Sequence, residues 1–146
     1  MQLSQRVIAV GLLAIAVANC RDSSGPFPIL ERRESVISLG DSPSITVPTD
    51  GTVGVPVPVA VVTVGGGCVR QGDTDVQVVG LAADVTPYDS EYVYLPPHMA
   101  CTDELRFYSH QTSVVFDAIG VATLRIHGRA EPGSVPMTVE RTIRIQ

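Results

Sequence analysis

The side chains that most often do chemistry in proteins are few in this chain and widely spaced. Its 146 residues include three histidines and three cysteines. A nucleophilic serine or cysteine needs a base within hydrogen-bond reach and a third group that orients the base. His98, His110 and His127 are the available bases, but the chain has no G-x-S-x-G turn of the kind that presents a nucleophilic serine. The sequence therefore predicts no catalytic residue, and a small hydrolase is the least favoured class.

Two groups of residues have the chemistry of metal ligands but not the order of a known site. His98, Met99, Cys101 and His110 offer the soft ligands of a blue-copper centre, whereas the cupredoxin family places its Cys before the closing His and Met. The acidic positions 73, 75, 84, 89 and 91 lack the spacing and the closing Glu of an EF-hand. We therefore expect no bound metal or cofactor. A periplasmic carrier of a ligand or metal is the alternative function.

Composition and charge exclude several classes of protein. Hydrophobic residues make up 45% of the chain, and ten arginines are outnumbered by fifteen acidic residues, giving a formal net charge of -5. No surplus of positive charge is left to neutralise phosphates, so nucleic acid is not an expected partner. A chain of this length builds one compact domain with an ordinary core.

The first nineteen residues read as an export signal. Arg6 supplies the positive charge, and residues 7–18 form an unbroken run of apolar or small residues. A membrane-spanning helix needs about 20 apolar residues, so this run fits the centre of a signal peptide better than a permanent anchor. Ala16-Val17-Ala18 is an A-x-A cleavage site that would release a freely secreted protein. That outcome stays open, as does an uncleaved signal anchor.

A second processing site overlaps the first. The quartet Val17-Ala18-Asn19-Cys20 resembles the lipobox of bacterial lipoproteins, with Asn19 at the position where that family has Gly, Ala or Ser. The resemblance implies that Cys20 carries a lipid and anchors the chain to a membrane of the bacterial envelope, on the periplasmic side. Residues 20–34 are then a flexible tether, because residues 21–28 are mostly small and polar and are punctuated by two prolines.

Cysteine counting favours the lipid-anchored interpretation. Three cysteines in an exported protein leave an odd thiol, whereas lipidation of Cys20 leaves Cys68 and Cys101 as an even pair in an oxidising compartment. We therefore predict a Cys68–Cys101 disulfide. Closing a loop of about 34 residues stabilises a fold by roughly 3.5–4 kcal/mol in the chain-entropy treatment.

Residues 35–146 are predicted to form an all-β domain. Valine is the commonest residue, and no stretch after residue 30 sustains apolar residues at helical spacing. Turns rich in Gly and Pro recur about every ten residues, which is typical of an antiparallel sandwich or barrel. The expected strands are 35–39, 44–47, 57–64, 75–79, 83–86, 91–95, 104–108, 113–116, 121–127 and 138–145.

Alternation in the last strands predicts which side chains form the core. Ala122, Leu124 and Ile126 share one face of their strand. Residues 139, 143 and 145 share one face of the next, and Arg141, which falls on the same face, is expected at the rim or beside a bulge. Residues 59–64 are mostly apolar on both faces, which indicates a central strand.

The C-terminal part of the chain resembles the closing strands of bacterial immunoglobulin-like domains. Residues 116–126 are similar to the turn and penultimate strand of such domains, and Thr142-Ile143-Arg144-Ile145 is similar to the end of the last strand. The resemblance covers about a quarter of the chain and implies an antiparallel β-sandwich with Greek-key connections. The chain differs from antibody domains in having no Trp and in the short separation of its cysteine pair.

Three of the four tyrosines, Tyr88, Tyr92 and Tyr94, fall within seven positions. With Val93 turned toward the core, these rings point outward. Tyr is favoured at interfaces because it offers a large area at low entropic cost and keeps a polar tip. We predict a partner-binding patch, with simple coverage of a sheet face as the alternative. The sequence thus predicts a non-enzymatic envelope lipoprotein module that contacts another envelope protein or complex, for example as an accessory subunit.

Overall fold

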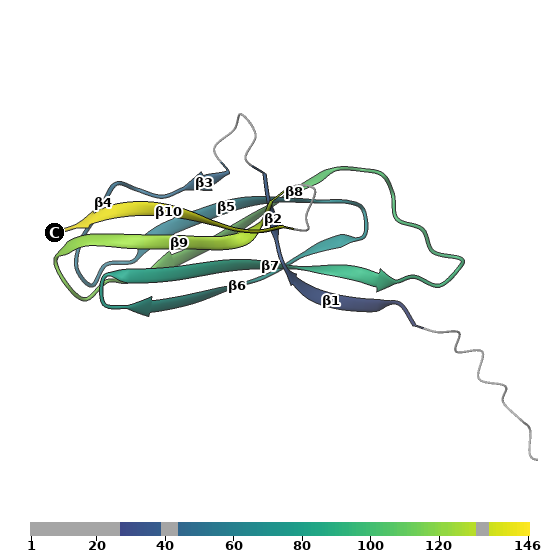
Figure 1. Cartoon of the computed structure of the whole chain (residues 1–146), viewed down its shortest axis with the longest axis horizontal. Helices are drawn as coiled ribbons and strands as arrows, with labels where there is room; N and C mark the ends of the chain where they lie inside the picture. The colour runs from purple at the N-terminus through teal and green to yellow at the C-terminus, as the bar shows by residue number, and fades with distance from the viewer. Residues whose placement is uncertain (1–26, 39–43, 131–134) are drawn as a thin grey trace, which may run out of the picture.

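The computed structural model describes residues 27–38, 44–130 and 135–146, and within these ranges the chain is all-β (Figure 1). Strands account for 68% of the described residues, and helix for 0%. None of the described segments forms a helix long and apolar enough to cross a membrane. The predicted export signal and Cys20 lie outside the described residues.

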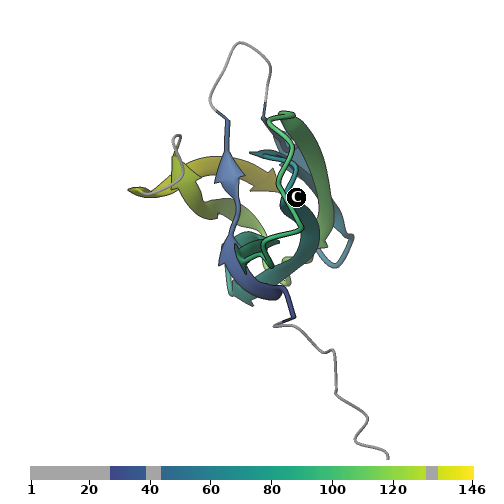
Figure 2. The same ribbon diagram turned by 90° about the vertical axis from the view of Figure 1, so that its right-hand side faces the viewer.

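Ten strands form one sheet that curls around a central core (Figure 2). Strand β7 pairs with β6 on one side, and on the other side with β9 at its beginning and β1 toward its end. From β9 the sheet continues to β10 and, through β2, to β5, which also pairs with β3 and β8. The strands are β1 (Ile29–Glu34), β2 (Val36–Ile37), β3 (Ile45–Thr46), β4 (Asp50–Gly51), β5 (Val57–Gly65), β6 (Val69–Val79), β7 (Ala82–Tyr94), β8 (Arg106–Val114), β9 (Gly120–Ala130) and β10 (Val135–Ile145).

The core contains the side chains that alternation predicted. Ala122, Leu124 and Ile126 of β9 are fully buried, as are positions 143 and 145 of β10. Strand β5 is central, because β8 lies on one side of it and β2 and β3 on the other. Arg141 is exposed and pairs opposite Leu124 without a shift in register, so it lies at the rim of the core and not beside a bulge.

Two pairs of expected strands are single long strands. Residues 83–86 and 91–95 were expected to be separated by a turn at Pro87, but β7 runs through this residue. Proline has no amide hydrogen to donate. Pro87 lies between Val85 and Tyr88, where the partner of β7 changes from β9 to β1, so little pairing is lost there. The expected strands at 104–108 and 113–116 are likewise joined in β8.

The expectation of a tether extending to residue 34 is wrong, because Ile29–Glu34 form β1, antiparallel to the end of β7. The next residue, Ser35, joins two strands that diverge. Its N–H donates to the Pro87 carbonyl at 2.9 Å, and its carbonyl accepts from the Arg129 N–H at 2.9 Å. The start of the domain is therefore inserted between β7 and β9.

Candidate contact site on the outer face of β7

Two of the three predicted tyrosines lie on the outer face of β7, and the third, Tyr94, lies at the end of this strand. Ala83 and Val85 are buried, and alternation along the strand places Tyr88 and Tyr92 on the opposite side. The register of β7 against β1 shifts between Tyr92 and Tyr94, so this alternation does not extend to Tyr94. Tyr94 is 37% exposed, and Tyr88 and Tyr92 are partly covered. Side chains from the neighbouring strands complete a surface that we call the tyrosine face. It consists of Leu30 and Arg32 of β1, Arg70 of β6 and the rings of Tyr88 and Tyr92, with Tyr94 at its end beyond the register shift.

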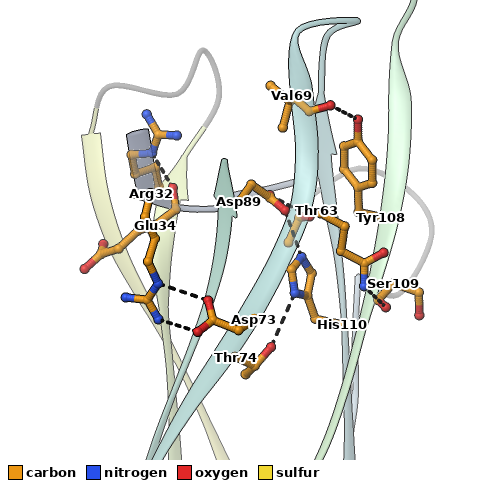
Figure 3. Close-up of polar contacts among 12 residues, drawn as sticks. Arg32, Glu34, Thr63, Val69, Asp73, Thr74, Asp89, Tyr108, Ser109 and His110 are labelled. Atoms are coloured by element: carbon orange, nitrogen blue, oxygen red, sulfur yellow. Dashed lines mark hydrogen bonds and ion pairs between the residues drawn. The ribbon is translucent and has the colours of Figure 1, made fainter. Parts of the chain in front are cut away.

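Arg32 crosses β7 and connects β1 with β6. Its guanidinium carbon lies 3.3 Å from the centroid of the Tyr88 ring. Beyond the ring, Arg32 Nε donates to Asp73 Oδ1 at 3.0 Å and Nη2 donates to Asp75 Oδ1 at 3.0 Å (Figure 3 shows the Asp73 contact). The hydrogen bond to Asp73 raises the pKa of Arg32 and lowers the pKa of Asp73. All three charged side chains are well exposed, so this network orients the ring more than it stabilises the fold.

A bulge in β6 places Asp73 within reach of Arg32. The pairing of β6 with β7 shifts between Gln71 and Thr74. At Gly72 a Cβ atom would lie 2.6 Å from the Tyr88 carbonyl oxygen, which is closer than van der Waals contact allows, so this approach requires glycine. On the same face, the Arg70 guanidinium carbon lies 5.4 Å from the Tyr92 ring centroid. Two of the three tyrosines therefore have an arginine over the ring.

Beneath this end of β7 lies a group that we call the polar core cluster, made of the buried residues Ser35, Thr63, Asp89 and His110 and the half-buried Thr74. His110 Nε2 lies 3.2 Å from Asp89 Oδ1, and Thr63 Oγ1 donates to Asp89 Oδ2 at 3.2 Å (Figure 3). The Thr74 hydroxyl lies 3.3 Å from His110 Nδ1. The cluster therefore ties β6 and β7 to β5 and β8 across the inside of the sheet.

The environment of Asp89 favours its charged form. Burial raises the pKa of this carboxyl, but His110 and the hydroxyls of Ser35 and Thr63 outweigh burial and hold the pKa below its usual value. The Ser35 hydroxyl makes no hydrogen bond of good geometry, so its contribution is only that of a nearby dipole. Because a carboxylate only accepts, His110 Nε2 carries the hydrogen between the two groups.

Thr74, His110 and Asp89 have the order of a nucleophile, a base and an orienting acid. Both ring nitrogens of His110 are engaged inside the sheet, however, and the side chain is only 1% exposed. A base needs room for a substrate within hydrogen-bond reach of it. The arrangement therefore acts as a structural tie between strands.

A second Thr–His–Asp group lies on the outer face of β7, β9 and β10. His127 Nε2 lies 2.8 Å from Asp84 Oδ1, and His127 Nδ1 lies 3.1 Å from the Thr138 hydroxyl. Arg125 also donates to Asp84, at 2.9 Å. The hydrogen bond from His127, assisted by Arg125, lowers the pKa of Asp84. His127 and Asp84 are 33% exposed on a sheet surface, whereas catalysis by such a group needs a site that excludes water and stabilises developing charge.

The predicted disulfide is present, and it limits metal chemistry. Cys68 and Cys101 are bonded, with their Cα atoms 5.1 Å apart, so Cys101 is not available as a thiolate ligand. His98 is exposed in the segment between β7 and β8, and His110 is engaged in the core. Within the described ranges, no group of three His, Cys, Asp or Glu residues is placed to hold a metal ion.

The acidic residues that the sequence offered as calcium ligands are instead paired with cations. Asp73 and Asp75 bind Arg32, and Glu91 Oε2 lies 3.4 Å from Arg33 Nη1.

No family model, no curated protein and no solved structure matches this chain. Its function is therefore argued from its own side chains.

Lowering the pH should weaken the fold partly through Asp89. A carboxyl whose pKa is depressed in the folded state stabilises fully above its unfolded pKa, near 3.8, and that contribution is lost as the pH falls through the folded pKa. We expect the urea midpoint of the wild type to fall as the pH drops below about 4, and to fall less steeply for Asp89→Asn. Asp103→Asn, at an exposed position, is the control. Equal slopes for wild type and Asp89→Asn would contradict this view of the cluster.

Proposed function

We propose that this chain is a non-enzymatic module of the bacterial envelope that contacts another envelope protein or complex through the tyrosine face. The observation that carries the proposal is the placement of Tyr88 and Tyr92 on one strand face, each with an arginine over its ring. Tyr and Arg are enriched among the residues that dominate binding energy at interfaces, because they combine apolar area with directed polar groups. Leu30, which is 43% exposed and opposite Tyr92, adds apolar surface to the same face.

Export to an oxidising compartment is part of the proposal. The Cys68–Cys101 disulfide is consistent with such a compartment. A lipid on Cys20 at the periplasmic side of a membrane follows from the resemblance of residues 17–20 to a lipobox, and an accessory subunit of a larger assembly is the role that a small anchored module would suit. We further propose an immunoglobulin-like sandwich topology, supported by the antiparallel β9 and β10 at the end of the chain.

The proposal predicts that the outward rings are needed for binding and not for folding. The double variant Tyr92→Ser/Tyr94→Ser should recover at least tenfold less of a specific partner from membrane extracts, since loss of interface anchors of this type costs more than about 1.4 kcal/mol. Its free energy of unfolding should stay within about 1 kcal/mol of the wild type, because neither ring is in the core. Recovery is measured by quantitative mass spectrometry of the captured proteins.

Phe107→Ser is the matched control, because Phe107 is an aromatic residue that is 65% exposed on β8, a strand that contributes no residue to the tyrosine face. The control variant should recover the same partner as the wild type. A partner that is lost equally from both variants, or retained by both, would contradict the assignment of binding to the tyrosine face. A large loss of stability in the double variant would show that the rings only cover the sheet.

A further inference from the structure

Arg70 of β6 is the arginine of the tyrosine face that no carboxylate of the described residues pairs with. It is exposed, and its guanidinium carbon lies 5.4 Å from the Tyr92 ring centroid. Most other arginines in the described ranges have a carboxylate oxygen at 3.9 Å or less, namely Arg32, Arg33, Arg106, Arg125 and Arg144. The positive charge of Arg70 is therefore available to a group outside the chain.

The contact with the ring leaves the hydrogen-bonding groups of Arg70 unused. A cation–π contact depends on the positive charge and does not engage the five N–H donors of a guanidinium. Arg32 also lies over a ring, but it donates to Asp73 and Asp75 as well. The planar fork of a guanidinium matches a carboxylate, which accepts two parallel hydrogen bonds from it.

The neighbours of Arg70 favour a carboxylate over a phosphate. Ser90 of β7 lies opposite both Arg70 and Arg32, so the two arginines belong to one row across three strands. Two aspartates already bind the Arg32 end of this row. They repel a phosphate monoester, with a charge of about −1.5 to −2, more strongly than a carboxylate with a single charge.

Apolar surface lies beside the charge. Tyr92, whose ring Arg70 approaches, is opposite Leu30 of β1, which is 43% exposed. A protein surface that carries an acidic side chain next to an apolar one complements both features, because interfaces combine apolar contact with directed polar groups.

We propose that the partner of the tyrosine face places the carboxylate of an aspartate or glutamate on Arg70 and an apolar side chain beside it, on Tyr92 and Leu30. The inference rests on the proposed partner contact and specifies its chemistry. Arg70 gives the contact its direction through charge-assisted hydrogen bonds. The attraction between opposite charges also speeds association at low salt.

Removing the charge should weaken the contact. Arg70→Ala should recover at least tenfold less partner from membrane extracts. Arg141→Ala is the matched control, because Arg141 is exposed on β10, donates to the Glu140 carbonyl and pairs with no carboxylate of the described residues. The control variant should recover as much partner as the wild type.

A crosslink identifies the group that Arg70 contacts. The chain contains no lysine, so Arg70→Lys introduces its single side-chain amine. In membranes that hold the full-length exported protein, a carbodiimide joins this amine to a carboxyl group in contact with it. An amide forms, and the reagent takes up the water that is lost. Mass spectrometry of the product identifies the residue at the other end.

Two further lysine variants calibrate the crosslink. Arg106→Lys is the positive control, because Arg106 Nη2 lies 2.7 Å from Glu104 Oε2, and the reagent should join these two positions within one chain. Arg141→Lys is the negative control. The proposal predicts at least tenfold more amide to an aspartate or glutamate of a different protein from position 70 than from position 141.

Several results would overturn the proposal. They are equal yields from positions 70 and 141, a bond from position 70 only to a carboxylate of its own chain such as Asp73, and a bond to a phosphate. No amide from position 70, while Tyr92→Ser/Tyr94→Ser still loses the partner, would remove this inference and leave the proposed function standing. A wild-type protein that captures no partner would remove both.

Discussion

Replacing His110 with alanine should destabilise the protein by about 3–5 kcal/mol, because it leaves the carboxylate of Asp89 buried with only the hydroxyl of Thr63 to donate to it. Asp89 is 4% exposed and His110 is 2% exposed, so water does not readily replace the lost contact. Small domains are stable by about 5–15 kcal/mol in total. The loss should therefore be plain in the midpoint of urea unfolding, followed by circular dichroism.

His127→Ala provides the control for this prediction, since His127 also pairs with an aspartate but is 33% exposed. The His127→Ala substitution should lower the free energy of unfolding by less than about 1 kcal/mol. If the His110→Ala variant does not fold, the double variant Asp89→Leu/His110→Leu keeps the test open, because removing both members of a buried pair often costs little. Equal losses for His110→Ala and His127→Ala would mean that the polar core cluster is not a structural tie.

Removing the disulfide with Cys68→Ser/Cys101→Ser should lower the free energy of unfolding by roughly 3.5–4 kcal/mol, as the chain-entropy relation gives for a bridge between residues 33 positions apart. The bridge joins the turn between β5 and β6 to the long segment between β7 and β8, where the Gly67 N–H also donates to the Thr102 carbonyl at 3.2 Å. Amide exchange should accelerate first in residues 95–105.

Reduction of the wild-type protein is the matched comparison for the double cysteine variant. Reduction should shift the urea midpoint by the same amount as the double substitution, because both remove the same restriction on the conformations of the unfolded chain. A difference of less than about 1 kcal/mol between oxidised wild type and the variant would contradict the stabilising role of the bridge.

Alternation alone predicted the part of the core where neighbouring strands are regular. Ala122, Leu124 and Ile126 were placed correctly because β9 has no bulge and its partners supply apolar neighbours. The same reasoning ended a strand at Pro87, since it treats proline as a break. Whether the partner of β7 changes at this residue depends on where β1 inserts, and a single sequence does not contain that information.

The buried charges of the polar core cluster were missed for a related reason. Asp89 has the same parity as Val85, so the sequence did contain a signal that it faces inward. That signal is readable only if β7 is taken as continuous through Pro87. His110 was not assigned to a strand, because the hydrogen bonds that make its burial tolerable come from β6 and β7, which are distant in sequence. Polar side chains that satisfy one another are invisible to hydrophobic periodicity.

Sequence and structure agree best on the cysteines, because counting thiols predicted the Cys68–Cys101 bond. The expectation that Val93 faces the core is wrong: Val93 is 41% exposed, and the register of β7 against β1 shifts beside it, between Tyr92 and Tyr94. Neither counting nor alternation could show that Arg32 lies over Tyr88, because β1 was taken for a tether. The charged composition of β1 is suited to a sheet edge, where arginine and glutamate discourage pairing with a strand of another molecule.

Photo-crosslinking in intact cells tests the central claim, binding through the tyrosine face, most directly. A photoreactive amino acid is placed at Tyr94 in the exported protein, with Phe107 as the comparison position on β8. We predict one discrete adduct with a different protein from position 94 and none of that adduct from position 107. No adduct at position 94, or the same adduct from both positions, would contradict the claim.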